Sequence, residues 1–440
     1  MNMMSILGTL SINALPATSK ALNIAVIGAG AAGLTSAKNA LEQGHNVVIY
    51  EKTEALGGIW WYTDKTGKDE YGIDIHTAMY QGLRTTLPYQ VMEYPGHKYP
   101  NNTQSYPPHE EVLKYLNSYA ERFDLKKHIK FHHFVDKIHS IQNDQWIVVV
   151  KDLPNSRTVS AIYDAVFVCV NMFSSPNYPQ IEGANEFKGK IIHSHDYRRA
   201  EDFRGADVLL IGGGDSGTDI AFQLSKTANR VTWSRRKPKE PTAKEQKGYG
   251  ETVTFKNDVK LLTSNGAEFM DNTQQDFTVI IYATGYRLSF PMLDDDAGIR
   301  IDDNYLQPLY MQTLNINHTT MAFIGLTGSN QIYDLKARFS LKFISGAKKL
   351  PLKSEMLEEM LNFTEAQQKK DVSKFDYNLL GPNKEYYEKM AQTADITKIT
   401  DVYMNIYSDA YPSPDEDPFG YRQYKYTIID DKTFIKEKEV

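Results

Sequence analysis

The chain has 440 residues, 41% of them hydrophobic and 24% charged, which is typical of a globular protein with two or three domains. Its net charge of −6 gives no reason to expect a nucleic acid or an anionic membrane surface as a partner, and it contains no uninterrupted apolar stretch of about 18 residues that could span a membrane. The only cysteine, Cys169, excludes an internal disulfide, whether structural or redox-active.

Residues 1–22 are predicted to be a leader ahead of the first domain. Met3 to Leu10 is mildly apolar, and Ala14 to Ala17 has the composition of a cleavage region, as in a secretory signal. No lysine or arginine precedes this stretch, however. A disordered leader on a soluble, cytoplasmic protein is the more economical interpretation, and a secreted protein with a signal peptide stays open.

The first predicted strand runs directly into a glycine-rich loop. Ile24 to Ile27 is an apolar run of the kind found in buried parallel strands, and the loop Gly28 to Gly33 follows it. Leu34 to Gln43 predicts the next helix, and a second apolar strand ends at Glu51. An acid at that place accepts hydrogen bonds from a ribose 2′-hydroxyl, so this unit is predicted to bind a dinucleotide without an extra phosphate.

The stretch that follows is irregular. Tyr71 to His109 is rich in Tyr, Pro and Asn and too long for a simple connection, so we expect it to form a surface over a site. Glu110 to Phe123 predicts a helix with one apolar face, and Ile129 to Val150 shows strand-like alternation. Ala165 to Val170 predicts another buried strand, and 174–179 is predicted to be a linker.

A second glycine-rich loop, Gly212 to Gly217, follows the apolar run Val208 to Ile211. Here the strand after the helix ends at Arg235, next to Arg236, and a guanidinium suits a 2′-phosphate. The chain is therefore predicted to hold two dinucleotides, one without and one with the extra phosphate, as an electron-transfer enzyme does. The single cysteine excludes the two-dinucleotide flavoproteins that reduce disulfides through a cysteine pair.

The predicted fold is α/β, with two Rossmann-like dinucleotide-binding domains. The smaller domain, residues 173–286, is inserted into a discontinuous first domain formed by 23–172 and 287–440. Six tyrosines among the last residues are expected to pack against the body of the protein or at a subunit interface, so a homo-oligomer stays open. They are Tyr403, Tyr407, Tyr411, Tyr421, Tyr424 and Tyr426.

Between the two loops lies the pattern Phe187-x-Gly189-x-x-x-His193-x-x-x-Tyr197, and Ala283-Thr284-Gly285-Tyr286 follows the second unit. Together with the loops, these residues resemble the flavin-containing monooxygenases, the single-chain class dependent on FAD and NADPH. The resemblance runs from about residue 23 to about residue 360. In its shortened form the chain is similar to insect members, among them alkaloid N-oxygenases of the senecionine or pyrrolizidine type.

The resemblance implies a role for individual residues and no metal site. In it, His193 and Tyr197 are scaffold for the connection between the domains. The residues implied to hold FAD are Gly28, Ala29, Gly30, Ala31, Ala32, Gly33, Glu51, Lys52, Gly58, Ile59, Trp60, Thr85, Thr86 and Val135. Those implied to hold NADPH are Gly212, Gly214, Ser216, Gly217, Thr218, Asp219, Ser234, Arg235 and Arg236.

Two positions depart from the family pattern. The family has an asparagine facing the flavin and the nicotinamide where this chain has Thr86, which keeps one donor and acceptor but loses the reach of the amide. Thr86 is therefore the candidate catalytic residue, and its identity puts protection of the oxygenated flavin in doubt. The strand end Cys169-Val170-Asn171 also replaces the expected Thr-Gly, so the first connection between the domains is expected to bend differently.

The reaction that the resemblance implies is an oxygenation. NADPH reduces FAD, O2 adds to the flavin as a C4a-hydroperoxide, and a soft nucleophile takes the distal oxygen. The leading hypothesis is N-oxygenation of tertiary amines, with plant pyrrolizidine alkaloids as the substrate class and detoxification as the role. Three alternatives stay open: an S-oxygenase of thioethers, a Baeyer–Villiger-type oxygenase, and an NADPH oxidase that releases hydrogen peroxide.

Overall fold

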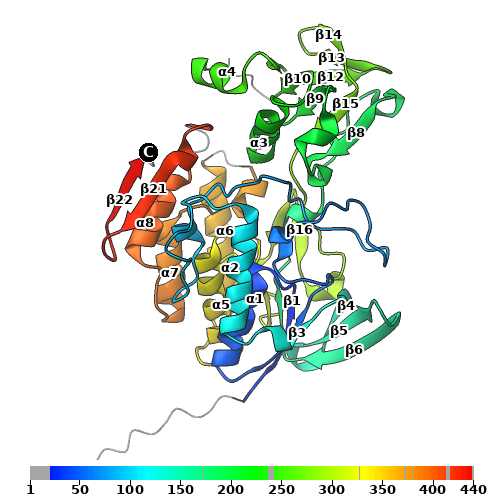
Figure 1. Ribbon diagram of the computed structural model, residues 1–440. Helices are drawn as coiled ribbons and strands as arrows, with labels where there is room; N and C mark the ends of the chain where they lie inside the picture. Colours follow the sequence, from blue (N-terminus) through cyan, green and yellow to red (C-terminus); the bar gives the residue numbers. More distant parts are fainter. Residues whose placement is uncertain are drawn as a thin grey trace, which may run out of the picture.

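The computed structural model describes residues 20–170, 172–235, 242–326, 328–370, 373–378, 380–412 and 417–438. Nearly all of the predicted leader, as well as Asn171 and Arg236, lies outside these residues. Two lobes are visible in Figure 1, each built around a parallel sheet. Among the described residues, no helix is long and apolar enough to cross a membrane.

The sheet of the larger lobe has seven strands in the order β18-β19-β20-β7-β1-β2-β3. Strands β3, β2, β1, β7 and β20 are parallel, and β19 and β18 are antiparallel additions at one edge. The apolar runs in β1 and β7 are buried on both faces, as expected for central parallel strands. The bounds are β1 (Asn23–Ile27), β2 (Asn46–Tyr50), β3 (Ile129–Lys130), β7 (Ala165–Val168), β18 (Leu309–Tyr310), β19 (Leu314–Asn315) and β20 (Met321–Phe323).

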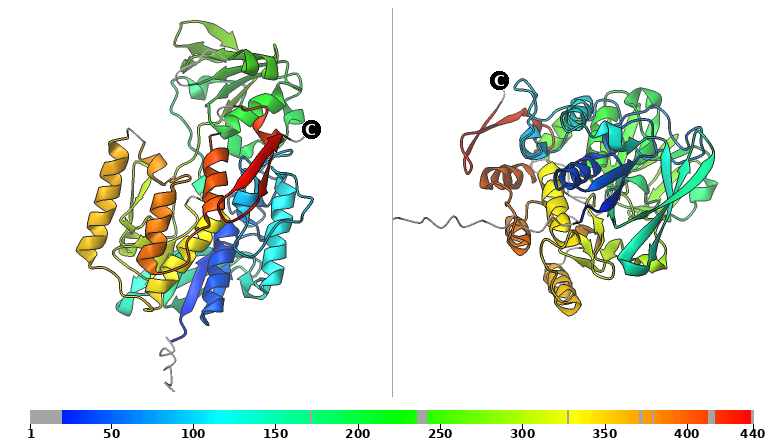
Figure 2. Two further views of the ribbon diagram at one scale, coloured as in Figure 1. Left: turned by 90° about the vertical axis from the view of Figure 1, so that its left-hand side faces the viewer. Right: turned by 90° about the horizontal axis from the view of Figure 1, so that it is seen from below.

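Helices cover one face of this sheet, with α1 and α5 side by side (Figure 2). Helix α1 begins three residues earlier than predicted, because the last residues of the glycine loop already form its first turn. Outer helices complete the layer, and their buried tyrosines belong to the main hydrophobic core. The helices are α1 (Ala31–Glu42), α2 (His109–Arg122), α5 (Asn330–Ile344), α6 (Lys353–Gln368), α7 (Lys384–Ala394) and α8 (Asp401–Ala410).

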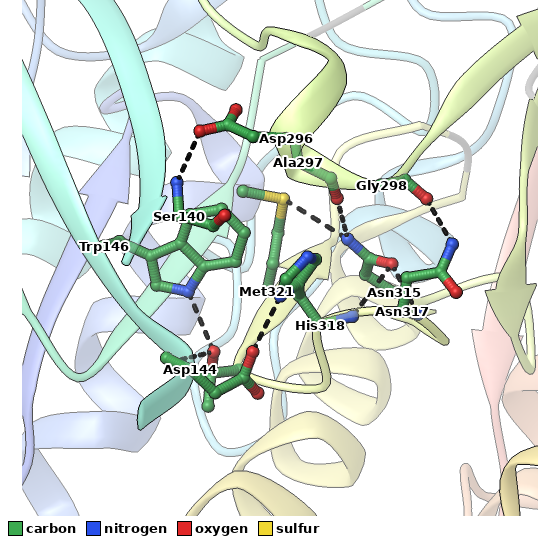
Figure 3. Close-up of polar contacts among 11 residues, drawn as sticks. Ser140, Asp144, Trp146, Asp296, Ala297, Gly298, Asn315, Asn317, His318 and Met321 are labelled. Carbon is green, nitrogen blue, oxygen red and sulfur yellow. Dashed lines mark hydrogen bonds and ion pairs between the residues drawn. The ribbon is translucent and has the colours of Figure 1, made fainter. Parts of the chain in front are cut away.

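A three-stranded antiparallel sheet packs near the other face: β4 (His133–Ile141), β5 (Gln145–Asp152) and β6 (Arg157–Tyr163). A polar network fixes the β4–β5 turn against the β19–β20 turn (Figure 3). Trp146 Nε1 donates to Thr320 Oγ1 at 2.8 Å, and His318 Nδ1 lies 2.9 Å from Asp144 Oδ1. In the same network Asn315 donates to the Ala297 carbonyl at 2.7 Å, which anchors the 294–297 turn as well.

The smaller lobe contains a five-stranded parallel sheet in the order β11-β10-β9-β15-β8, and a three-stranded antiparallel sheet. Helix α3 follows β9 directly and returns the chain to β10. The predicted strand 277–282 is β15, which begins at Val279. The bounds are β8 (Lys190–His193), β9 (Asp207–Ile211), α3 (Asp215–Leu224), β10 (Arg230–Ser234), α4 (Ala243–Tyr249), β11 (Val253–Lys256), β12 (Val259–Leu262), β13 (Gly266–Phe269), β14 (Gln274–Asp276) and β15 (Val279–Tyr282).

The strands of the smaller lobe lie in the sequence between β7 and β18, so the seven-stranded sheet is built from two separate stretches of chain. The predicted α/β class with two Rossmann-like units, the smaller one inserted, is confirmed. After β15 come a hairpin of β16 (Arg300–Asp302) and β17 (Tyr305–Gln307), and near the C-terminus a hairpin of β21 (Tyr424–Ile428) and β22 (Phe434–Lys438).

Two expectations about aromatic residues are refined by the structure. The 71–109 stretch is more than a surface layer, because Tyr94, Tyr99 and Tyr106 are buried in or against the core. Tyr94 also donates to the carbonyl of Ala31 at 2.7 Å, at the start of α1. Near the C-terminus, four of the six tyrosines are buried against the body of the protein, whereas Tyr411 is 47% exposed.

Candidate functional site

The first glycine loop brings two stretches of backbone into contact. A Cβ on Gly58 would lie 3.0 Å from the Cα of Gly30, and a Cβ on Gly33 would lie only 1.9 Å from the carbonyl oxygen of Gly28. No side chain caps the N-terminus of α1, where Gly30 is the N-cap residue. The first N–H groups of a helix have no partner within the helix and attract an anion, so this end of α1 fits a pyrophosphate.

Glu51 is buried at the end of β2, beside this loop. Its Oε2 accepts from the backbone N–H of Ala29 at 2.9 Å, and its Oε1 accepts from Thr53 N and Oγ1 at 3.0 and 2.9 Å. These bonds fix the carboxylate. Oε1 already accepts two hydrogen bonds, and Oε2, which accepts one, keeps a lone pair for a ribose hydroxyl. The neighbouring Lys52 points elsewhere, because its Nζ donates to the carbonyl of Asp74 at 2.7 Å.

The loop that carries Thr85 and Thr86 belongs to the larger lobe and lies in the sequence between β2 and α2. Thr85 is buried, and among the described residues its hydroxyl has no hydrogen-bond partner. Thr86 is half-buried. A buried hydroxyl without a partner costs stability unless a ligand satisfies it, so Thr85 fits a polar group of a bound cofactor. Val135 of β4 pairs with Val150, and the register shifts directly after it, so that Asp136 has no partner in the β4–β5 ladder.

The second glycine loop repeats the arrangement of the first. A Cβ on Gly217 would lie 2.5 Å from the carbonyl oxygen of Gly212, whereas a Cβ on Gly214 would meet nothing within 4 Å. Gly214 is the N-cap of α3, and no side chain caps this helix either. The open space before the helix fits a second pyrophosphate, with Ser216 in the first turn of the helix.

Arg235 is held in a defined position at the end of β10. Its guanidinium lies 4.5 Å from the ring centroids of both Trp233 and Phe255, and its Nη1 lies 3.4 Å from Oε1 of Glu245. Stacking on two rings leaves the edge of the guanidinium to bind a phosphate. The side chain of Ser234 is buried and donates to the carbonyl of Asn257 at 2.8 Å, so its contribution is structural.

The side chain of Asp219 is bound by other parts of the protein. Its carboxylate accepts from both Nη atoms of Arg422, at 3.0 and 3.1 Å, and from the hydroxyl of Tyr80 at 3.1 Å. Thr218, one residue earlier, donates to the carbonyl of Gly214 at 3.3 Å. Sequence reasoning missed Arg422 and Tyr80 because neither belongs to a motif.

The connection between the lobes contains buried polar residues. His193 Nδ1 accepts from the backbone N–H of His195 at 3.0 Å, and burial lowers the pKa of His193 to about 4, so this ring is neutral at neutral pH. Tyr197 donates to Gln223 of α3 at 2.9 Å. Both contacts support the scaffold interpretation. No cluster of His, Cys, Asp or Glu able to hold a metal occurs in the described part of the chain.

A cavity of about 1040 Å³ lies where the lobes meet. Arg84, α3 and the segment just before β21 contribute to its walls; Thr218, Phe222 and Arg422 are among the residues there. No residue of 28–33 or 212–217 lines this cavity. The fold and the two glycine loops define a protein with two Rossmann-type units, each with a loop that fits a dinucleotide.

Comparison with known proteins gives the family. A model of the flavin-binding monooxygenase-like family matches residues 21–250 and 246–406. The chain is 33% identical to senecionine N-oxygenase of Tyria jacobaeae over 438 residues, which cover 99% of this chain and 96% of that protein. It is 30% identical to flavin-containing monooxygenase FMO GS-OX-like 2 of Arabidopsis thaliana over 395 residues, 85% of this chain and 84% of that protein.

A solved structure of S-allyl-L-cysteine S-oxygenase from Allium sativum is similar, with a TM-score of 0.84, 27% identity, and coverage of 91% of this chain and 95% of that one. Tmm from Pelagibacter sp. strain HTCC7211 has a TM-score of 0.80 and 27% identity over 92% of this chain and 93% of that one. The chain belongs to the flavin-binding monooxygenase-like family. Membership confirms the predicted enzyme class, a flavin-dependent monooxygenase with FAD and NADPH as cofactors.

Proposed function

We propose that the chain is an N-oxygenase of tertiary amines, dependent on NADPH and O2, with plant pyrrolizidine alkaloids as its substrate class and their detoxification as its role. The observation that carries this proposal is the match to senecionine N-oxygenase, which spans 99% of this chain and 96% of that protein. An end-to-end match includes the C-terminal segment beside the cleft as well as the two cofactor units.

In this proposal residues 23–172 and 287–440 hold FAD, and residues 173–286 hold NADPH. The uncapped ends of α1 and α3 bind the two pyrophosphates, since both present free N–H groups. Glu51 accepts from the FAD ribose, and Arg235 binds the 2′-phosphate of NADPH, with Arg236 outside the described residues as a second candidate. Thr85 donates or accepts at the flavin through its unsatisfied hydroxyl.

When bound, FAD supplies the redox chemistry, taking a hydride from NADPH and passing electrons to O2 so that one oxygen atom reaches the substrate. The chain's own residues bind the two cofactors, orient them and shield them from water. In this proposal the smaller lobe presents the nicotinamide to the flavin held by the larger lobe, and the packing between the lobes excludes water. Thr86 lies on the loop beside Thr85, where its hydroxyl can hydrogen-bond the reacting groups without accepting or releasing a proton.

Thioether S-oxygenation is the second candidate. It is favoured by the similarity to S-allyl-L-cysteine S-oxygenase over 91% of this chain at a TM-score of 0.84. Both activities need the same cofactor arrangement, so the substrate decides between them.

The test is product analysis. The purified protein is incubated with NADPH and 18O2 and with matched pairs of tertiary amines and thioethers, and products are measured by mass spectrometry alongside hydrogen peroxide. We expect an amine N-oxide that carries one 18O atom and little peroxide. Labelled sulfoxide without N-oxide would establish the second candidate. NADPH consumption that yields only hydrogen peroxide would refute both and leave an oxidase.

A further inference from the structure

The segment 417–426, here called the C-terminal strap, joins the larger lobe to the smaller one. The ring of Phe419 lies between α3 and α4, with its centroid 5.7 Å from Phe222 and 4.7 Å from Tyr249. Gly248 makes room for it, because a Cβ there would lie 2.4 Å from the Phe419 ring. Asp417 adds an ion pair to Lys244 at 2.6 Å. The strap therefore packs on two helices of the smaller lobe.

Arg422 of the strap binds both lobes with one side chain. Its two Nη atoms donate to the two carboxylate oxygens of Asp219 at 3.0 and 3.1 Å. Its Nε donates to the carbonyl of Thr85 at 3.1 Å, and its Nη2 donates to the carbonyl of Arg84, also at 3.1 Å. A planar guanidinium can make these bonds in two directions together, which a lysine ammonium cannot.

Further contacts join the same two elements. Tyr80 donates to Asp219 at 3.1 Å, and Gln223 donates to the carbonyl of Gln81 at 3.2 Å. Asp219 and Gln223 are four residues apart on α3 and so share one face of the helix. The strap is held to the larger lobe as well, since Gln90 donates to the carbonyl of Tyr426. Helix α3 is thus fastened to the loop that carries Thr85 and Thr86.

We propose that Arg422 is a positioning residue that fixes α3 against the Thr85–Thr86 loop and thereby sets how the nicotinamide approaches the flavin. This inference rests on the proposed function, in which α3 begins at the NADPH site and the loop contacts FAD. In this proposal Arg422 acts through Asp219 and two carbonyl groups, and the Asp219 carboxylate, which the resemblance assigned to NADPH, is bound by Arg422 and Tyr80 instead. Displacing reacting groups by about 1 Å costs a rate factor on the order of a hundredfold, so a loosened α3 slows hydride transfer.

The test compares Arg422→Gln and Asp219→Asn in the purified, FAD-containing protein. We expect faster hydrogen–deuterium exchange of backbone amides in both 80–90 and 215–224, measured without nucleotide. We also expect anaerobic reduction of the flavin by NADPH to slow by about tenfold or more, with flavin content unchanged and NADP+ affinity within about threefold. Arg422→Lys should restore little of the rate, because an ammonium cannot reproduce the two-directional bonding.

Arg199→Gln is the matched control. Arg199 lines the same cavity, but its Nε bonds Asp202 of its own segment at 2.9 Å. It should behave as the wild type. Unchanged exchange and reduction in both Arg422→Gln and Asp219→Asn would overturn the proposal, as would additive effects in the double variant, because residues acting as one pair are not additive. A large loss of NADP+ affinity in both would also overturn it, by placing the pair in the nucleotide site.

These measurements stand apart from the proposed function. They use no oxygenated substrate, so a wild-type protein that failed to form an N-oxide would refute the proposed function and leave the exchange and reduction results interpretable.

Discussion

The guanidinium of Arg235 takes part in two kinds of interaction: it lies against aromatic rings, and it faces a carboxylate. The guanidinium lies 4.5 Å from the ring centroids of both Trp233 and Phe255, which are neighbours of each other, and Nη1 lies 3.4 Å from Glu245, a distance too long for a strong charge-assisted bond. The stacking holds the side chain in place before any ligand binds, which reduces the entropy that phosphate binding must overcome. A 2′-phosphate would bind more strongly than the carboxylate because it offers more charge and more acceptors.

Replacing Arg235 with alanine should raise the KM for NADPH by about 10- to 100-fold, because hydrogen bonds to charged groups contribute about 1.5–3 kcal/mol. The KM for NADH, which lacks the 2′-phosphate, should change little. Steady-state kinetics with both cofactors checks this. Arg230→Ala, at the opposite end of β10, serves as the control and should leave the NADPH-to-NADH preference intact. Equal effects on both cofactors would contradict phosphate recognition by Arg235.

Lys336 is a buried lysine whose burial makes the stability of the protein depend on pH. It is buried on α5, and its Nζ donates to the carbonyl of Gln312 at 3.5 Å. Burial lowers the pKa of Lys336 from 10.5 to about 8. Because the folded-state pKa lies below the unfolded-state value, the unfolded chain binds more protons between about pH 8 and 10.5. The buried charge therefore lowers the free energy of unfolding below pH 8, and this destabilisation disappears as the pH rises to 10.5.

Lys336→Met should stabilise the protein at pH 7 by up to about 3 kcal/mol, with the gain shrinking between pH 8 and 10.5. Urea unfolding of wild type and variant across this range measures the difference. Lys342→Met, at a half-buried position of the same helix, is the control for replacing a lysine of α5 with methionine. A stability difference that stays constant from pH 7 to 10.5 would be inconsistent with a buried, titrating Lys336.

At the scale of elements, α1 and α3 begin in the same way. Each N-cap is a glycine with nearly identical backbone angles, φ −78° and ψ −174° at Gly30 and φ −83° and ψ −174° at Gly214, and neither helix has a side-chain cap. Ser, Thr, Asp or Asn usually occupies this position and satisfies an orphan N–H. Two helices that lack this cap in the same fold leave those donors free for a ligand.

The pair allows a matched experiment. Gly30→Val should abolish FAD retention, because the side chain would occupy the place of the pyrophosphate. Gly214→Val should leave FAD in place and abolish NADPH binding. Neither backbone conformation penalises a side chain, since both φ values are negative. The measurements are the flavin absorbance of the purified proteins and NADPH titration, and a yellow Gly30→Val protein would refute the assignment of FAD to α1.

At the scale of the whole molecule, the strap packs on helices of the smaller lobe and hydrogen-bonds the larger one, so we expect it to couple the unfolding of the two lobes. Phe419→Ala would remove the ring between α3 and α4, leaving Phe222 and Tyr249 without their shared partner. We expect the smaller lobe to unfold before the larger one, so that calorimetry shows two transitions where the wild type shows a single one or a smaller separation. Tyr411→Ala, at an exposed position, is the control. Identical calorimetric traces for wild type and Phe419→Ala would argue against coupling through the strap.

Local patterns predicted much of this protein. The loops 28–33 and 212–217 identified both nucleotide units, because a strand, a glycine turn and a helix are adjacent in sequence and the glycines are dictated by backbone contacts a few residues apart. The contrast in charge between Glu51 and Arg235 is the basis on which FAD is assigned to the first unit and NADPH to the second. The roles of individual site residues, and the boundaries of the domains, stay predictions. The burial of the 71–109 stretch was not predicted, because buried tyrosines outside helices and strands follow no helical or strand period.

The sequence by itself determined the α/β class, the order of the two units and the family, since each depends on residues close together in the chain. Only the tertiary structure decided that Arg422 meets Asp219 and Thr85, more than 200 and 330 residues earlier, and that Phe255 stacks on Arg235. Such contacts leave no local pattern, because they form when separate elements pack and the chain between them is free to vary. How the two units face each other is therefore a property of the folded molecule.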